Sequence, residues 1–286
     1  MPELPEVETV ANDLNAYLAG KTIAGIAVIG KHQLVKTPMA FFKKAVIGKR
    51  IRRIYRRAKM VVIDLGGSFI LIHLKMTGQL IYVLKRPLVA GGHPIISTGI
   101  TVPNSFTRVV FDFKSGGKLY FNDLRKFGWI KLLSAEEFVD LEAATGLEPL
   151  SRGFTLGYFS KMLERRSRSP IKAALLDQKH LVGLGNIYVD EVLFKARVLP
   201  TRSVASLMTA EKGAIFKSIT AVLKQAIRQR GTTFSNFLDP NGLKGNYVAH
   251  LKVYGRQGKP CPVCGMPIKK IKTAGRGTHF CPRCQN

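Results

Sequence analysis

Apolar residues recur at β-type intervals in the first half of the chain and at helical intervals in the second half. In the first half, short apolar runs alternate with turn signals, and the Gly-Gly pairs at 66–67 and 116–117 are typical hairpin connections. The predicted strands cover residues 22–29, 50–55, 59–64, 69–75, 109–113, 118–121 and 129–133. Short strands around one core predict a β-sandwich or barrel.

Helical periodicity is present at the N-terminus and again after residue 156. Val7, Val10, Leu14 and Leu18 lie at helical spacing, and a glycine two residues later is placed to end the helix. Further helices are predicted over residues 156–165, 170–177, 187–196 and 210–230. Residues 85–105 contain three prolines and a Gly-Gly pair, which predicts a long loop.

The charge of the chain indicates the class of its partner. Its 286 residues include 45 Lys and Arg against 18 Asp and Glu, a formal net charge of +27 that is spread along the sequence. This balance favours a polyanion, with nucleic acid ahead of a membrane. A hydrophobic content of 46% argues against a disordered basic tail protein. Because no apolar run reaches membrane-spanning length and the N-terminus is acidic, we expect a cytoplasmic protein without membrane attachment.

All four cysteines lie near the C-terminus in two Cys-x-x-Cys pairs. Cys261 and Cys264 form the first pair, and Cys281 and Cys284 form the second. This spacing predicts one structural Zn²⁺ held by four thiolates, with disulfides or free thiols as the alternative. Four thiolates leave no open position for catalysis. The ion would instead hold basic residues toward a phosphate backbone, among them Arg276 at a predicted hairpin tip.

The first residues place a candidate amine nucleophile beside two carboxylates. Removal of Met1 would expose the secondary amine of Pro2, next to Glu3 and Glu6. An α-amino group has a pKa of about 8, so a useful fraction is uncharged at neutral pH and can form an iminium with an aldehyde-like carbon. The carboxylates can move protons. Alternatively, Pro5 and the acids simply open a helix.

Two predicted strand ends carry long side chains suited to DNA. The sequence HLKMTG at 73–78 and the sequence NDLRKFG at 122–128 are called the two wedge sequences. Met76, Arg125 and Phe127 could insert between bases, because apolar side chains and arginine replace lost stacking. Alternatively, Met76 and Phe127 are core residues and Arg125 forms a structural ion pair.

In the helical half, the turn at 183–186 predicts an anion site. Asn186 is a suitable N-cap for the helix that follows, and two glycines allow close approach of a ligand to the backbone. Amides at a helix N-terminus bind phosphate, and Lys172 with three arginines at 165–168 adds positive charge. An ordinary turn beside a solvated charged face is the alternative.

Together these sequences closely resemble the bacterial formamidopyrimidine-DNA glycosylases, DNA-repair enzymes that remove oxidised purines. The resemblance covers nearly the whole chain and includes PELPEVET at 2–9, RAK at 57–59, both wedge sequences, GLGNIY at 183–188, VYGR at 253–256 and GRGTHFC at 275–281. It implies an α+β multidomain fold. The implied parts are an N-terminal catalytic β-sandwich domain with a flanking N-terminal helix at 1–134, a linker at 135–155, a helix–two-turn–helix domain at 156–232, a flexible lesion-capping loop at 233–250 and a zinc finger at 251–286.

The resemblance also implies roles for matching residues. Pro2 is the nucleophile that forms a Schiff base with C1′, Glu3 is the proton donor and Glu6 supports them. Lys59 and Arg276 are the acid/base residues of β- and δ-elimination. The implied contacts to damaged double-stranded DNA are His73, Met76, Arg108, Arg125, Phe127, Lys172, Asn186 and Tyr254. We further expect a monomer associated with the bacterial nucleoid.

One position departs from the family pattern, and two other functions compete. The family's His-x-His or His-x-Arg triplet is Phe-Thr-Arg at 106–108 here, which removes a DNA-contacting histidine. An endonuclease VIII-type enzyme for oxidised pyrimidines is the nearest alternative. Leu4 and the second wedge sequence favour the purine enzyme instead. A non-catalytic zinc-finger protein that binds nucleic acid fits the composition and the cysteines, but it has no need of Pro2 and Glu3 together.

Overall fold

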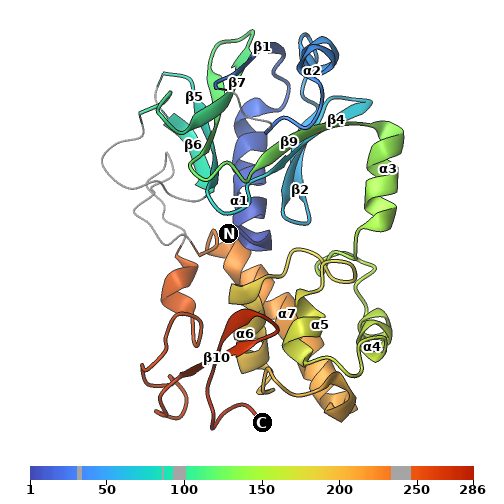
Figure 1. The fold of residues 1–286 in the computed structure, drawn as a ribbon, viewed down its shortest axis with the longest axis vertical. Coiled ribbons are helices and arrows are strands. Elements are labelled where there is room, and N and C mark those ends of the chain that lie inside the picture. Colours follow the sequence, from blue (N-terminus) through green and yellow to red (C-terminus); the bar gives the residue numbers. More distant parts are fainter. Residues whose placement is uncertain (31–33, 86, 93–100, 233–245) are drawn as a thin grey trace. The chain divides into compact units, whose positions relative to one another are not determined.

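The computed structural model describes residues 1–30, 34–85, 87–92, 101–232 and 246–286. The chain forms two compact units (Figure 1). The first comprises Met1–Glu142 with Gln229–Asn246, and the second comprises Ala143–Arg228 with Tyr247–Asn286. Most of the loop expected at 233–250 lies outside the described residues, and its last part forms a 3₁₀ helix, Tyr247–His250. In the described part of the chain, no helix is both long and apolar enough to cross a membrane.

The first unit contains two antiparallel sheets that share one core, as the sandwich prediction requires. Their strand orders are β1-β7-β8-β5-β6 and β2-β3-β4-β9. The strands are β1 (Ile23–Val28), β2 (Arg53–Arg57), β3 (Met60–Asp64), β4 (Ser68–His73), β5 (Gly78–Val83), β6 (Pro87–Gly92), β7 (Thr107–Phe113), β8 (Lys118–Asp123) and β9 (Trp129–Ser134). Phe111 from one sheet and Ile63 from the other both belong to this core. Helix α1 (Leu4–Leu18) adds Val7 and Leu14, so the core fixes the start of the chain.

Strand β6 corrects the loop prediction for residues 85–105. It pairs with β5, and a Cβ on Gly91 would lie only 2.1 Å from Cγ2 of Val10 in α1. A strand that passes so close to a helix needs glycine, whereas a sequence pattern attributes paired glycines to a turn. Strand β5 was also not predicted. Residues 93–100 of the expected loop lie outside the described part.

Two helices in this unit likewise have no counterpart in the prediction. Helix α3 (Ala135–Ala144) occupies much of the expected linker at 135–155 and buries a single side chain, Phe138, whose ring stacks on Phe69 at 4.2 Å. Helix α2 (Met39–Val46) buries only Phe42 and Val46. One or two buried residues leave too weak a periodic pattern to detect in the sequence.

The second unit is helical and ends in a hairpin. Its helices α4 (Leu156–Glu164), α5 (Ile171–Leu176), α6 (Asn186–Lys195) and α7 (Thr209–Arg228) begin and end within two residues of the prediction. Helix α6 is central, because all its residues from 187 to 194 are buried. A short 3₁₀ helix, Val204–Ser206, precedes α7. The hairpin consists of β10 (Lys269–Thr273) and β11 (Arg276–Phe280).

Candidate active site and nucleic-acid interface

Pro2 and Glu3 lie where α1 begins, and both are buried. Glu3 is the N-cap of α1 and is 4% exposed, and its backbone N–H donates to Oε2 of Glu6 at 2.9 Å. Met1 precedes Pro2 in the chain and is half exposed. While Met1 is present, the Pro2 nitrogen is an amide. Removal of this exposed residue would leave an amine next to a buried carboxyl group.

Glu6 connects the start of α1 to the segment that precedes residue 233. Its Oε1 accepts hydrogen bonds from the backbone N–H of Thr232 at 2.7 Å and from the Thr232 hydroxyl at 2.9 Å. Gly231 has φ of +77°, and a Cβ there would lie 2.6 Å from the same oxygen. Arg230 forms an ion pair with Asp13 of α1. These contacts hold the N-terminal site and this segment together within one unit.

Lys59 lies in the turn before β3, and His73 ends the neighbouring strand β4 of the four-stranded sheet. Lys59 follows Ala58, which has φ of +53°, in the tight turn between β2 and β3, and it is 8% exposed. His73 pairs with Met60 in the register of β3 and β4. Its Nδ1 accepts the backbone N–H of Lys75 at 3.0 Å, so the proton of the neutral ring is on Nε2.

Burial and then the charges of Lys75 and Lys59 lower the pKa of His73 from 6.5 to about 4. The ring is therefore neutral at physiological pH. A neutral imidazole with Nε2–H can donate a hydrogen bond to a phosphate oxygen.

The two wedge sequences meet at one exposed tip. Nη1 of Arg125 lies 3.2 Å from Sδ of Met76, and its Cζ lies 4.7 Å from the centre of the Phe127 ring. Met76 is 42% exposed and Phe127 is 52% exposed, so neither is a core residue. This excludes the core alternative. Leu124, which the sequence did not single out, is also half exposed beside this tip.

A buried carboxylate fixes the loop that carries this tip. Asp123 is fully buried and accepts hydrogen bonds from the Thr77 hydroxyl and from the backbone N–H of Gly128, the latter at 2.7 Å. The Thr77 hydroxyl in turn accepts the backbone N–H of Arg125 at 2.9 Å. Arg108, expected to contact DNA, is 8% exposed and its Nε donates to the carbonyl of Asp123 at 3.0 Å. In this structure Arg108 supports the tip loop from inside.

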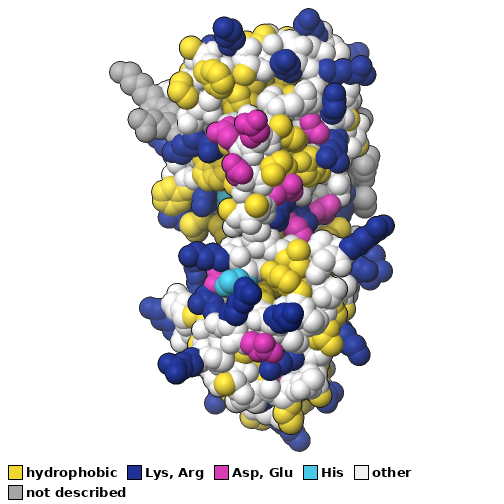
Figure 2. Space-filling model, turned by 90° about the vertical axis from the view of Figure 1, so that its right-hand side faces the viewer, with side chains coloured by type: hydrophobic (Ala, Val, Ile, Leu, Met, Phe, Trp, Pro, Cys, Tyr) yellow, Lys and Arg dark blue, Asp and Glu magenta, His cyan; other side chains and the backbone are white. Residues whose placement is uncertain are grey.

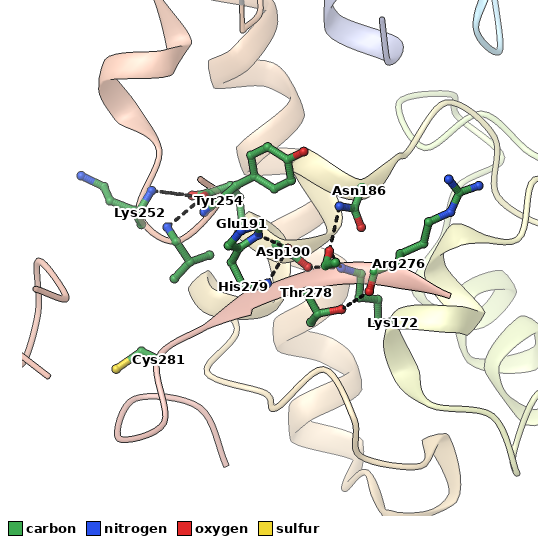
Figure 3. A network of polar contacts seen from close by, with 12 residues as sticks. Lys172, Asn186, Asp190, Glu191, Lys252, Tyr254, Arg276, Thr278, His279 and Cys281 are labelled. Atoms are coloured by element: carbon green, nitrogen blue, oxygen red, sulfur yellow. Dashed lines mark hydrogen bonds and ion pairs between the residues drawn. The ribbon is translucent and has the colours of Figure 1, made fainter. Parts of the chain in front are cut away.

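In the second unit, the anion-site residues have different partners from those expected. Gly185 rather than Asn186 caps α6, and Nδ2 of Asn186 donates to the carbonyl of Gly277 at 2.8 Å. Lys172 is fully buried, and its Nζ contacts Oδ1 of Asp190 at 2.6 Å and the same Gly277 carbonyl at 3.0 Å. In this structure the Lys172 ammonium is therefore occupied by protein groups and is not an exposed cation of the kind expected for a phosphate contact. Figure 3 shows these side chains pointing toward β11.

Arg276 directly follows the hairpin turn of the finger. Ala274 and Gly275 both have positive φ, 50° and 75°, which suits a two-residue turn. The Arg276 side chain is exposed, and in Figure 3 its guanidinium points away from the buried network. The hairpin thus presents a cation at its end, as the sequence predicts. Figure 2 shows further Lys and Arg side chains spread over the visible face of both units.

Helix α6 also carries two adjacent buried acids that the sequence pattern did not reveal. Glu191 accepts backbone N–H groups of Lys252, Val253 and Tyr254 at 2.9 to 3.1 Å. Burial raises the pKa of Glu191, and these three hydrogen bonds oppose the rise. The Tyr254 ring meets the His279 ring edge-on at 5.0 Å. The sequence does offer one signal of these buried acids, because two consecutive acids are unusual in an apolar helix of a strongly basic chain.

The four cysteines form a site that fits one zinc ion. Their Sγ atoms all lie within 4.8 Å of one another. The Cys261 and Cys284 sulfurs are 3.9 Å apart, and those of Cys264 and Cys281 are 3.4 Å apart. A tetrahedron of Zn–S bonds of about 2.3 Å needs S–S distances of about 3.8 Å. Four thiolates saturate the ion, so its contribution is to hold the ends of the hairpin module.

Comparison with known proteins gives the same match along the whole chain. Residues 1–130 match the formamidopyrimidine-DNA glycosylase N-terminal domain, residues 145–237 its H2TH domain, and residues 258–286 the zinc finger found in FPG and IleRS. The formamidopyrimidine-DNA glycosylase of Pelotomaculum thermopropionicum is 40% identical over 100% of this chain and 99% of that protein. That of Herpetosiphon aurantiacus is 39% identical over the full length of both.

Solved structures agree. A point mutant of Lactococcus lactis FPG in complex with a Fapy-dG containing DNA has a TM-score of 0.88 and 33% identity, with both chains fully covered. Lactococcus lactis Fpg with an abasic site containing DNA has a TM-score of 0.87 and 33% identity over 99% of each chain. From its N-terminal site, its cysteine cluster and these full-length matches, the chain belongs to the formamidopyrimidine-DNA glycosylase family of DNA-repair enzymes.

Proposed function

We propose that this protein is a bifunctional base-excision-repair enzyme that excises oxidised purines, such as 8-oxoguanine and formamidopyrimidines, and then cleaves the abasic strand. The observation that carries the proposal is the placement of Pro2 and Glu3 at the buried start of α1. The name of the relatives and the Fapy-dG DNA bound by the Lactococcus lactis protein support the substrate class. We place its action, as a monomer, on the nucleoid in the bacterial cytoplasm.

The first step uses the amine released by removal of Met1. The Pro2 nitrogen forms a bond to C1′ while the bond from C1′ to the damaged base breaks with its electron pair on the base. As the sugar ring opens, the base and O4′ each take a proton, one from the Pro2 nitrogen and one from Glu3. The product is an iminium between Pro2 and C1′.

The iminium then allows two eliminations, because it withdraws electrons from the sugar. Loss of a proton from C2′ breaks the C3′–O bond, and loss of a proton from C4′ breaks the C5′–O bond. Each phosphate leaves with the electron pair of the broken bond. We assign the proton transfers of the first elimination to Lys59 and those of the second to Arg276. Neither elimination needs the zinc ion, which has no open position.

The exposed tip of the first unit suits extrusion of the damaged nucleotide. An enzyme that acts on C1′ must take its nucleotide out of the stack and fill the gap. Met76, Arg125 and Phe127 are exposed together, and the buried Asp123 fixes their loop. His73 adds a neutral hydrogen-bond donor near Lys59.

Borohydride trapping on a panel of defined lesions tests the proposal. We expect covalent trapping on abasic DNA and faster excision of 8-oxoguanine than of thymine glycol. Glu3→Gln should lower base excision by about 10²-fold or more, whereas Glu136→Gln, the same change at an exposed site of α3, should not. DNA binding without trapping would indicate a non-catalytic binding protein. A preference for thymine glycol would indicate an endonuclease VIII-type enzyme.

A further inference from the structure

A fully buried acid connects α6 to the strand that carries Arg276. Asp190 is 0% exposed and has two partners. Its Oδ1 contacts Nζ of Lys172 at 2.6 Å, and its Oδ2 accepts the backbone N–H of His279 at 2.8 Å and lies 3.3 Å from Nδ1 of the same histidine. Because buried ion pairs stabilise a fold little compared with apolar packing, the pair calls for a reason other than stability.

The network fixes the backbone directly after Arg276. The carbonyl of Gly277 accepts hydrogen bonds from both Lys172 and Asn186, at 3.0 and 2.8 Å. The Thr278 hydroxyl donates to the carbonyl of Arg276 at 3.1 Å. Polar contacts therefore hold residues 276, 277 and 279, and most of them come from side chains of α5 and α6. The Arg276 side chain extends away from these contacts (Figure 3).

We propose that Asp190 and Lys172 are positioning residues for Arg276. Asp190 holds the Lys172 ammonium against the Gly277 carbonyl and holds the backbone of His279, so that the strand cannot shift or twist below the arginine. A long side chain can transfer a proton at one defined atom only if the backbone that carries it is fixed, because a displacement of about 1 Å can cost about 10²-fold in rate. The inference rests on the proposed role of Arg276 in the second elimination.

The ratio of the two elimination products gives a specific readout. Loss of the C2′ proton alone leaves an unsaturated sugar on the 3′ end, and further loss of the C4′ proton with cleavage of C5′–O leaves a 3′ phosphate. Of the two eliminations, a displaced Arg276 should slow only the second. The covalent bond to Pro2 forms before both steps, so borohydride trapping should change little.

The experiment is single-turnover cleavage of DNA with one abasic site. We expect Asp190→Asn to lower the share of the second-elimination product about tenfold, with trapping within about twofold of wild type. The same share should fall in the paired variant Lys172→Met with Asp190→Asn, which leaves no unpaired charge and carries the test if the single variant does not fold. Thermal unfolding and zinc content establish folding of each variant.

Two further variants separate positioning from general damage. Combining Asp190→Asn with Arg276→Ala should give the product ratio of Arg276→Ala alone, since Asp190 acts through that arginine. Glu211→Gln breaks the Arg202–Glu211 ion pair elsewhere in the same unit and should leave the ratio unchanged. An unchanged ratio in both folded Asp190 variants would overturn the inference, as would a further decrease in the combined variant. Failure of wild-type protein to be trapped would instead overturn the proposed function.

Discussion

At the scale of single residues, burial decides what a polar side chain can do. The resemblance to the family implies that His73, Lys172 and Arg108 each contact DNA. The structure buries Lys172 and Arg108 against protein groups, while His73 remains partly exposed and neutral. Local sequence identifies these residues but not their depth, because depth depends on which distant strand or helix covers them.

The low pKa of His73 gives a pH-dependent stability. Because its folded pKa of about 4 is below the unfolded value of 6.5, the unfolded chain binds the proton more tightly. The contribution of the neutral His73 ring to the free energy of unfolding is fully present above pH 6.5 and is lost as pH falls from 6.5 toward 4. Relative to His73→Gln, wild type should therefore lose unfolding free energy over this range, measured by denaturant titration at several pH values. A His73 ring that titrates near pH 6.5 by NMR would refute this.

At the scale of elements, the long periodic segments were predictable and the short or closely packed ones were not. Helices α4, α5 and α7 each bury apolar residues at helical spacing, and α6 is buried on every side. The sequence of β6 predicts a loop because one of its glycines allows close contact with α1. Helices α2 and α3 bury too few residues to show a helical period. The N-terminal site was recognised through family motifs, whereas the pairing of Glu6 with Thr232 joins residues 226 positions apart and has no local signature.

Gly231→Ala should disturb this Glu6 contact. The substitution costs about 1 kcal/mol for its left-handed backbone, and its Cβ would also collide with the Glu6 carboxylate. Gly48→Ala is the matched control, since Gly48 has φ of +84° and nothing within 4 Å of the added Cβ. We expect Gly231→Ala to lose about 1–2 kcal/mol more in denaturant unfolding than the control, and to slow base excision about tenfold. Equal effects of the two substitutions would contradict the steric account.

Zinc removal should loosen the finger without unfolding the larger parts of the protein. A closed four-thiolate site contributes folding free energy to its own module. We expect Cys264→Ser, or a strong chelator, to lower DNA affinity about tenfold or more, because the backbone that carries Arg276 is no longer fixed. A tenfold loss of affinity corresponds to about 1.4 kcal/mol. Circular dichroism should show the remaining helices and strands intact. Full DNA affinity in protein shown to be zinc-free would refute this.

At the scale of the whole molecule, the charge of +27 implies largely electrostatic DNA binding. Charge sets non-specific affinity, whereas we expect the exposed tip at Met76, Arg125 and Phe127 to act only where a nucleotide is extruded. The two contributions should therefore separate in a salt titration on lesion-containing and undamaged DNA.

Arg276→Ala should make the slope of log affinity against log salt shallower by about 0.9, the contribution of one phosphate contact. Phe127→Ala removes no charge, so its slope should match wild type, and it should weaken lesion binding more than binding to undamaged duplex. If Phe127→Ala weakened binding to both DNAs equally, Phe127 would be a residue that supports the fold.

Mass spectrometry of the borohydride-trapped complex tests most directly whether the Pro2 nitrogen is the nucleophile. We expect the sugar adduct on the N-terminal peptide, at a Pro2 that is the first residue. Protein that retains Met1 should form no adduct, because an amide nitrogen has no basic lone pair. An adduct on Lys59 or another internal lysine, or full trapping by protein proven to retain Met1, would contradict the account.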